Sequence, residues 1–289
     1  MPGPLSTRNA WRIKTIIMTK PDIAGARNLQ TTGGSAVKSP SRPAEIIDLR
    51  ERNFNMLKQD LILRNPLRLL GQEDQYILPE GSMGAVLARA GVGKTALMVQ
   101  IALDTLLRGK NVLHVSMDDP VDKVSLWHKE VFGNMAAQYN LPHANQLWDS
   151  ILTKRFIMTF RVEGFSVPKL EERLHDLTEQ NIFNPQMIII DGFPFESAAH
   201  EPLRQLKAFA VSNRLRIWFS VRTHRHEQLG ATGMPPRLSK LDDLFGVILQ
   251  LQPDGKKVHV KVSKGFRNAD EYPELLLDPA TMLINQTSK

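Results

Sequence analysis

Short apolar runs alternate with segments whose apolar residues recur at helical spacing, from about residue 45 to residue 241. The runs are rich in β-branched and aromatic side chains and predict strands at residues 84–88, 111–117, 156–160, 187–190 and 217–221. Between the first two runs, apolar residues at helical spacing predict a helix that ends at Arg108 and Gly109, and Ser166 with Pro168 predicts the start of another. We therefore expect a three-layer α/β fold, in which helices cover a mostly parallel central sheet.

The pattern changes after Leu241, where apolar residues alternate in 246–251 and 258–262 around a Pro-Asp-Gly turn. This pattern predicts an antiparallel C-terminal hairpin added to the sheet edge. Residues 1–45 show little apolar periodicity, so we expect a flexible basic tail followed by one domain, residues 46–289. An organelle transit peptide is an alternative interpretation of residues 1–21, which contain no acidic side chain.

The amino-acid composition and net charge exclude several kinds of function. The 289 residues include no cysteine, which excludes a disulfide scaffold, a thiolate metal site and a cysteine nucleophile. No apolar run approaches the roughly 18 to 20 residues of a membrane span, so we expect a soluble, cytoplasmic protein. The net charge of +7 suggests a nucleic-acid partner, but the seven basic and two acidic residues of 1–45 place +5 of it in the tail.

A glycine-rich segment lies between the first predicted strand and the helix after it, with the sequence Ala-Arg-Ala-Gly-Val-Gly-Lys-Thr at 88–95. Backbone N–H groups of such a loop surround a polyphosphate, and the lysine adds charge at the β and γ phosphates. Ala88 replaces the first glycine of the usual G-x-x-x-x-G-K-[ST] pattern. The predicted nucleotide-binding residues are Arg89, Ala90, Gly91, Val92, Gly93, Lys94, Thr95 and Ala96.

A second strand, 187–190, ends in Asp191, which is the place for a carboxylate that binds Mg²⁺ together with the Thr95 hydroxyl. A simple turn with Gly192 and Pro194 is the alternative for Asp191. Residues 91–96 also match the dinucleotide fingerprint G-x-G-x-x-A of dehydrogenases. Lys94 and Thr95 favour ATP and Mg²⁺, because a dinucleotide pyrophosphate has no use for those two side chains.

With these residues assembled, the chain from about residue 76 to 284 resembles a RecA-like P-loop ATPase domain. Its loop at 88–95 is similar to that of DnaB-type helicases, whose loop also begins with Ala-Arg. Residues 112–120, Val-Leu-His-Val-Ser-Met-Asp-Asp-Pro, resemble the strand that presents the catalytic acid in DnaB-type, RepA-type and KaiC-like relatives. Residues 219–225 resemble the sensor strand, and 262–267 resemble the late Lys-x-Arg element.

The resemblance implies roles for individual residues. Lys94 and the loop would hold the β and γ phosphates, Thr95 and Asp191 would position Mg²⁺, and Asp118 or Asp119 would orient water. Lys264 or Arg267 would reach a neighbouring subunit's nucleotide, which implies a homo-oligomer, either a ring or a filament. The sequence departs from the family in three places: aspartates replace the usual glutamate, Arg222 replaces the sensor glutamine, and two residues separate Lys264 from Arg267. Helix capping by Asp118 and Asp119, and a solvated strand end for Lys264 and Arg267, are the alternatives.

Residues 201–240 carry eight basic and two acidic side chains, a net charge of +6. The resemblance places the loops after residue 221 beside single-stranded nucleic acid, so the candidate contacts are Arg222, His224, Arg225 and Arg237. The expected function is an oligomeric Mg·ATP-hydrolysing motor, helicase-like or recombinase-like, in replication, recombination or repair. The alternatives are a KaiC-like regulatory ATPase or assembly switch without nucleic acid, and a slow-turnover ATP-binding protein.

Overall fold

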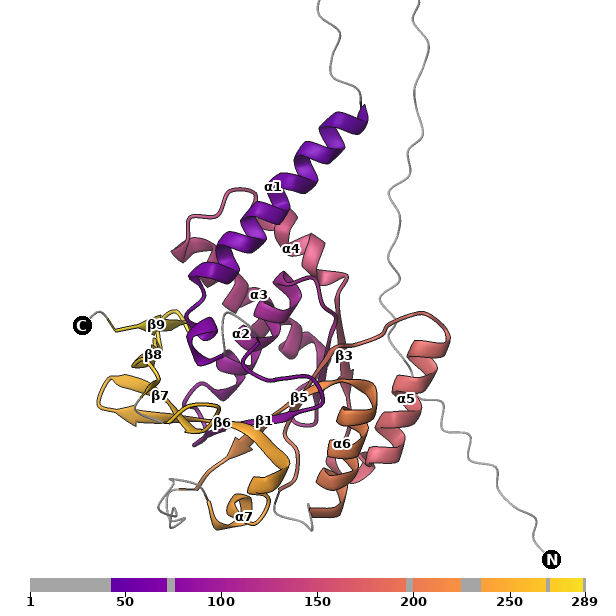
Figure 1. Ribbon diagram of the computed structural model, residues 1–289, viewed down its shortest axis with the longest axis vertical. Coiled ribbons are helices and arrows are strands. Elements are labelled where there is room, and N and C mark those ends of the chain that lie inside the picture. Colours follow the sequence, from indigo (N-terminus) through magenta and orange to yellow (C-terminus); the bar gives the residue numbers. More distant parts are fainter. Residues whose placement is uncertain (1–42, 72–75, 196–199, 225–234, 269–270, 288–289) are drawn as a thin grey trace, which may run out of the picture. The chain divides into compact units, whose positions relative to one another are not determined.

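The structure is a computed structural model that describes residues 43–71, 76–195, 200–224, 235–268 and 271–287 (Figure 1). Most of the predicted basic tail therefore lies outside the described residues. The α-helices are α1 (Pro43–Arg64), α2 (Lys94–Leu107), α3 (Val121–Gln138), α4 (Ala144–Leu152), α5 (Val167–Glu179), α6 (His200–Asn213) and α7 (Pro236–Ser239). The 3-10 helices are η1 (Pro66–Leu70), η2 (Val162–Gly164) and η3 (Asp242–Leu244). The strands are β1 (Met83–Ala88), β2 (Val112–Ser116), β3 (Arg155–Thr159), β4 (Met187–Asp191), β5 (Arg216–Arg222), β6 (Phe245–Asp254), β7 (Lys257–Lys264), β8 (Leu275–Leu277) and β9 (Ile284–Gln286).

The described strands form one sheet in the order β3-β2-β4-β5-β1-β6-β7-β8-β9. The first six of these run parallel to one another, and β7, β8 and β9 continue the sheet antiparallel. This mixed α/β architecture is consistent with a P-loop NTPase fold. The predicted hairpin forms between β6 and β7, but the prediction that it lies at the sheet edge is wrong. β6 pairs with β1, and β8 and β9 lie beyond β7; these three-residue strands are too short to produce a recognisable sequence period.

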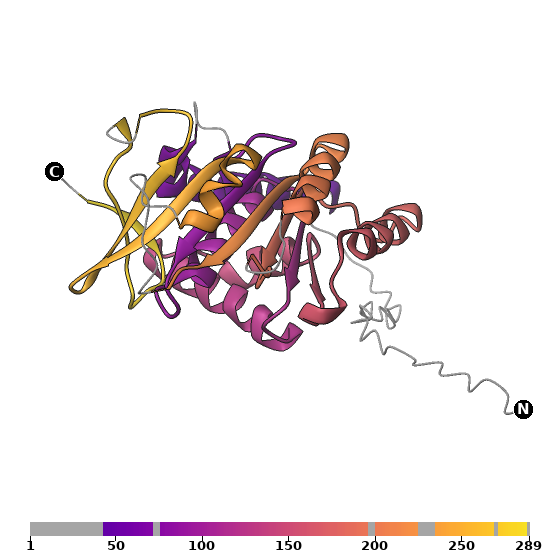
Figure 2. The same cartoon turned by 90° about the horizontal axis from the view of Figure 1, so that it is seen from below.

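Helices cover both faces of the sheet (Figures 1 and 2). Alternate residues of β1 point to opposite faces, so Val86 belongs to the core formed with α2, α3 and α4, while Ala85 and Leu87 belong to the core formed with α5 and α6. Every residue of α2 from Ala96 to Leu107 is buried. A helix enclosed on all sides gives the loop before it a rigid base. Among the described helices, none has the length and apolar content needed to cross a membrane.

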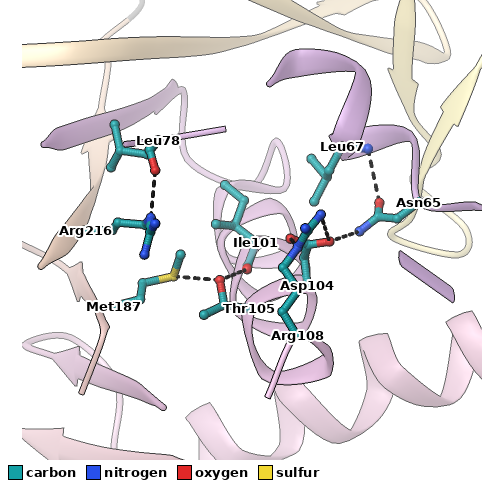
Figure 3. A network of polar contacts seen from close by, with 9 residues as sticks. All are labelled: Asn65, Leu67, Leu78, Ile101, Asp104, Thr105, Arg108, Met187 and Arg216. Carbon is teal, nitrogen blue, oxygen red and sulfur yellow. Dashed lines mark hydrogen bonds and ion pairs between the residues drawn. The ribbon is translucent and has the colours of Figure 1, made fainter. Parts of the chain in front are cut away.

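A polar network fixes the amino edge of the parallel strands, at the end of the sheet away from the glycine-rich loop (Figure 3). Asn65 caps η1 and also donates to buried Asp104 on α2, 3.3 Å away. Arg216, at the start of β5, donates to the Leu78 carbonyl at 2.8 Å. The Tyr76 ring lies within cation–π distance of two guanidinium groups, 3.9 Å from Arg216 and 4.9 Å from that of Arg108. These contacts join α2, β5 and the segment before β1.

Two histidines are buried together between β2 and α3. His114 Nδ1 and His128 Nε2 are 3.1 Å apart, and both side chains are fully enclosed. The outer nitrogens, His114 Nε2 and His128 Nδ1, have no hydrogen-bond partner among the described residues. Burial lowers the pKa of His114 to about 3 and lowers that of His128 well below its usual range, and the nearby Arg155 guanidinium acts in the same direction on both. Burial therefore favours the neutral form of both rings in the folded protein.

This pair predicts a loss of stability in mild acid. In the unfolded chain both rings take up protons below pH 6.5, whereas in the folded chain they do not, so stability is complete above pH 6.5 and falls below it. His114 alone, with a folded pKa of about 3, should reduce the free energy of unfolding by about 2 kcal/mol between pH 7.5 and pH 5, and His128 should add to this loss. Urea denaturation at both pH values measures this loss.

Matched variants separate the buried pair from other titrating groups. His114→Asn and His128→Gln keep a nitrogen near the shared hydrogen bond but do not titrate, so the double variant should lose much less stability on acidification. His175→Gln is the control, because His175 is exposed on α5 beside Glu179. An acid-induced loss that is the same in the double variant as in the unsubstituted chain contradicts the assignment to this pair.

Candidate functional site

The glycine-rich segment forms the connection between β1, which ends at Ala88, and α2, which begins at Lys94. Gly91 and Gly93 have φ angles of 76° and 110°, in the region that favours glycine. A Cβ atom on Gly93 would also lie 2.5 Å from Leu277 Cδ2 on β8. Gly93 is the N-cap residue of α2 and supplies no side-chain cap, so the first N–H groups of the helix remain available to an anion.

Lys94 folds back over this loop. Its Nζ donates to the carbonyl oxygens of Ala88 at 3.3 Å and Arg89 at 3.2 Å. Burial lowers the Lys94 pKa, and the nearby Asp191 carboxylate opposes that shift. A partly buried cation held at the mouth of a glycine-rich loop suits a phosphate group as its ligand.

Thr95 and Asp191, the two residues predicted to hold Mg²⁺, lie together. Asp191 ends β4, next to β2 and β5, and burial raises its pKa. Hydrogen bonds from the side chains of Ser220 and Thr95 oppose that shift. Hydroxyl and carboxylate oxygens are the donor types that Mg²⁺ takes from a protein when phosphates complete its coordination. The residues present therefore fit this ion.

Ser220 is a site residue that the sequence analysis missed. It lies on β5, and its hydroxyl donates to Asp191 Oδ1 and accepts from the Gly192 N–H at 3.2 Å. Ser220 thus fixes both the carboxylate of Asp191 and the turn that follows it. In the sequence, Ser220 is recognisable only as a polar residue between the apolar Phe219 and Val221. Its contact with Asp191 depends on the pairing of β4 with β5, which the sequence does not specify.

The structure distinguishes Asp118 from Asp119. Asp118 lies against Gly192, where an added Cβ atom would come within 2.8 Å of the Asp118 carboxylate carbon. Burial raises the Asp118 pKa, Asp191 and Asp119 raise it further, and Arg222 and Lys94 oppose the shift. These neighbours place Asp118 beside the loop and Asp191.

Asp119 is held differently. Its carboxylate forms an ion pair with Lys123 at 2.8 Å, and its backbone N–H donates to Ser116 Oγ at 2.9 Å. Helix capping was the alternative for both aspartates, but Pro120 occupies the N-cap position of α3 and makes no side-chain cap. Asp118 is therefore the better placed of the two to face a reacting phosphate.

Lys264 and Arg267 do not join this site within one chain. Lys264 pairs in register with Ile248, which is level with Ala85 near the amino end of β1. Its Nζ donates to the Asp242 carbonyl at 2.7 Å and contacts Asp242 Oδ2 at 3.1 Å. Arg267 donates to the Gly71 carbonyl and lies over the Tyr272 ring at 5.6 Å. Their predicted action on a neighbouring subunit stays a prediction.

The predicted nucleic-acid residues are only partly described. Arg222 and His224 line a cleft of about 490 Å³ beside the loop, whose other lining residues are Arg89, Ala90, Val92, Thr223 and Pro253. Arg225 and the side chain of Arg237 lie outside the described residues. The basic window 201–240 does not form one surface, because Arg216 is buried at the amino end of β5 and Lys207 donates to the Gly81 carbonyl at 2.9 Å.

Comparison with known protein families shows that a model described as an AAA domain matches residues 63–203. The matched region runs from the end of α1 to the beginning of α6 and contains the loop at 89–96, Asp118 and Asp191. The match supports a P-loop ATPase superfamily, and a domain of this type indicates nucleotide binding and ATPase activity in general. A search of curated proteins finds no match to this chain.

Proposed function

We propose that this chain is a RecA-like ATPase that binds Mg·ATP on the loop 89–96 and hydrolyses it. The observation that carries the proposal is the meeting of Lys94, Thr95, Asp118 and Asp191 at the carboxyl ends of β1, β2 and β4. The carboxyl end of a parallel sheet is where ligands bind in open α/β folds. The strand arrangement, six parallel strands followed by antiparallel ones, supports the RecA-like assignment.

The residues of the site have separate roles in phosphoryl transfer. Lys94 and the loop N–H groups bind the β and γ phosphates and hold the γ phosphorus in line with a water. Asp118 accepts the proton from that water as its oxygen attacks the phosphorus, and ADP leaves with the electron pair of the broken P–O bond. Mg²⁺, when bound between Thr95 and Asp191, neutralises charge on the phosphates.

Ser220 should affect the Mg²⁺ requirement more than nucleotide binding. Ser220→Ala removes the hydroxyl that orients Asp191, and loss of such a supporting contact usually weakens metal binding about 10- to 100-fold. A titration of ATP hydrolysis with Mg²⁺ should therefore require a correspondingly higher metal concentration for half-maximal rate. Ser150→Ala is the control, because Ser150 Oγ donates to a carbonyl within α4. An unchanged Mg²⁺ requirement in Ser220→Ala contradicts this role.

Nucleic-acid action is a second proposal, favoured by the placement of His224 on an open cleft beside the loop. An oligomer is part of the same proposal, with Lys264 and Arg267 directed to a neighbour. ATP hydrolysis measured with and without single-stranded DNA or RNA over a salt series tests it. Stimulation that weakens with salt supports a helicase-like or recombinase-like motor. Absence of both stimulation and binding favours a KaiC-like regulatory ATPase or assembly switch.

A further inference from the structure

Arg222 lies beside the start of the glycine-rich loop. It is the last residue of β5 and is in register with Ala88, the last residue of β1. The next residue, Thr223, donates its N–H to the Ala88 carbonyl at 3.0 Å. Because β1 and β5 are parallel and adjacent, Arg222 is fixed beside the loop by strand pairing within one chain. Its side chain is exposed and lines the cleft that Ala90 and Val92 also line.

The charge of Arg222 acts on two groups of the site. It lowers the pKa of Lys94 and also that of Asp118. Strand pairing places Arg222 level with Ala88, whose carbonyl accepts from Lys94 Nζ, and two residues beyond Ser220, which contacts Asp191, so Arg222 borders the space in front of these groups. The terminal phosphate of a bound ATP would occupy that space, since Lys94 reaches the β and γ phosphates and Asp118 faces the attacking water.

The other candidate cations are engaged elsewhere in the same chain. Lys264 contacts Asp242 near the amino ends of the parallel strands, and Arg267 donates to the Gly71 carbonyl. The strand register keeps Lys264 level with Ala85, whereas Arg222 is level with Ala88 at the loop itself. Within one chain, strand geometry therefore favours Arg222 over both of these residues.

We propose that Arg222 is a catalytic residue that contacts the γ phosphate of the nucleotide bound by its own chain. This inference rests on the proposed ATPase function. Arg222 remains protonated throughout, and its guanidinium stabilises the charge on the phosphoryl oxygens while water attacks the phosphorus and ADP departs. The chain thus carries an arginine of its own that supplies this charge. In this assignment Arg222 binds the nucleotide and does not bind a nucleic acid.

Steady-state kinetics with three variants tests the role. Arg222→Ala should lower kcat about 100-fold, the usual effect of removing one donor to the developing charge, and should do so without nucleic acid present. Arg222→Lys should recover part of the loss, because it restores the charge but not the bidentate geometry. Arg173→Ala, exposed on α5, is the neutral control.

Mixing distinguishes an arginine acting in its own chain from one acting on a neighbour. The Lys94→Ala chain has a damaged loop but an intact Arg222, and the Arg222→Ala chain has the reverse. If Arg222 acts within its own chain, an equimolar mixture has no more activity than the two proteins measured separately. Recovery of activity on mixing overturns the proposal, as does a kcat for Arg222→Ala equal to that of the unsubstituted chain.

The ratio of ATP to ADP affinity gives a readout that does not require turnover. Contact with the γ phosphate predicts that Arg222→Ala lowers this ratio by about tenfold or more while ADP affinity is unchanged, in keeping with the loss of one charge-assisted hydrogen bond. An unchanged ratio overturns the proposal for Arg222 alone. If the unsubstituted chain binds neither nucleotide, the proposed ATPase function fails, and the assignment of Arg222 fails with it.

Discussion

Lys94→Ala is expected to weaken ATP binding by about 10- to 100-fold, the loss of one or two hydrogen bonds made by a charged donor. Hydrolysis should fall at least as far, because the same side chain holds the phosphate in place for attack. The substitution should not destabilise the fold, since burial disfavours the charged form of Lys94 and lowers its pKa. Equilibrium titration with ATP and a thermal melt measure the two effects.

A matched control for this prediction is Lys129→Ala, which removes an exposed lysine from α3. It should leave both ATP affinity and turnover within about twofold of the unsubstituted chain, the usual effect of a surface change. If Lys94→Ala binds ATP as tightly as the Lys129→Ala control does, the loop 89–96 is not the phosphate site.

The second large effect is expected at Asp118. Asp118→Asn cannot accept a proton from water, so kcat should fall about 10²- to 10⁴-fold while ATP affinity changes little. Asp119→Asn should cost much less, because Asp119 is paired with Lys123. Turnover should also decrease in acid as Asp118 becomes protonated, at a pH above the usual range for aspartate because burial raises its pKa.

Two further variants examine the surroundings of Asp118. Asp118→Glu keeps the carboxylate and adds one methylene, so it should retain turnover within about tenfold of the unsubstituted chain. Gly192→Ala should impair hydrolysis nearly as much as Asp118→Asn, because the new Cβ atom would come within 2.8 Å of the Asp118 carboxylate carbon and displace the carboxylate. A larger loss in Asp119→Asn than in Asp118→Asn contradicts the assignment of Asp118 as the water-orienting group.

Much of this site could be predicted from the sequence because its residues lie at strand ends. The apolar runs before the glycine-rich loop and before Asp191 correspond to β1 and β4, and parallel pairing brings the carboxyl ends of such strands to one edge. Asp191 follows the second run directly and Thr95 follows the loop after the first, so their meeting was foreseeable. The choice between Asp118 and Asp119 was not, because it depends on Gly192 and on Lys123.

Other features depend on strand direction and pairing, which no local pattern specifies. Ser220 acquires a partner only because β5 lies next to β4. Arg216 and Arg222 belong to the same basic window of the sequence, but they lie six positions apart along β5, about 20 Å, so Arg216 contacts the amino edge and Arg222 lies beside the loop. Net charge over a window therefore gave little information on where a charged surface lies.

The central claim is that the loop 89–96, with Lys94, Thr95 and Asp191, binds Mg·ATP. Titration of the unsubstituted chain with ATP and, separately, with NAD, each in Mg²⁺ and again in excess chelator, tests it most directly. The account predicts saturable ATP binding that is strengthened by Mg²⁺, and no binding of NAD at comparable concentrations. Saturable binding of NAD in the absence of any ATP binding would contradict it.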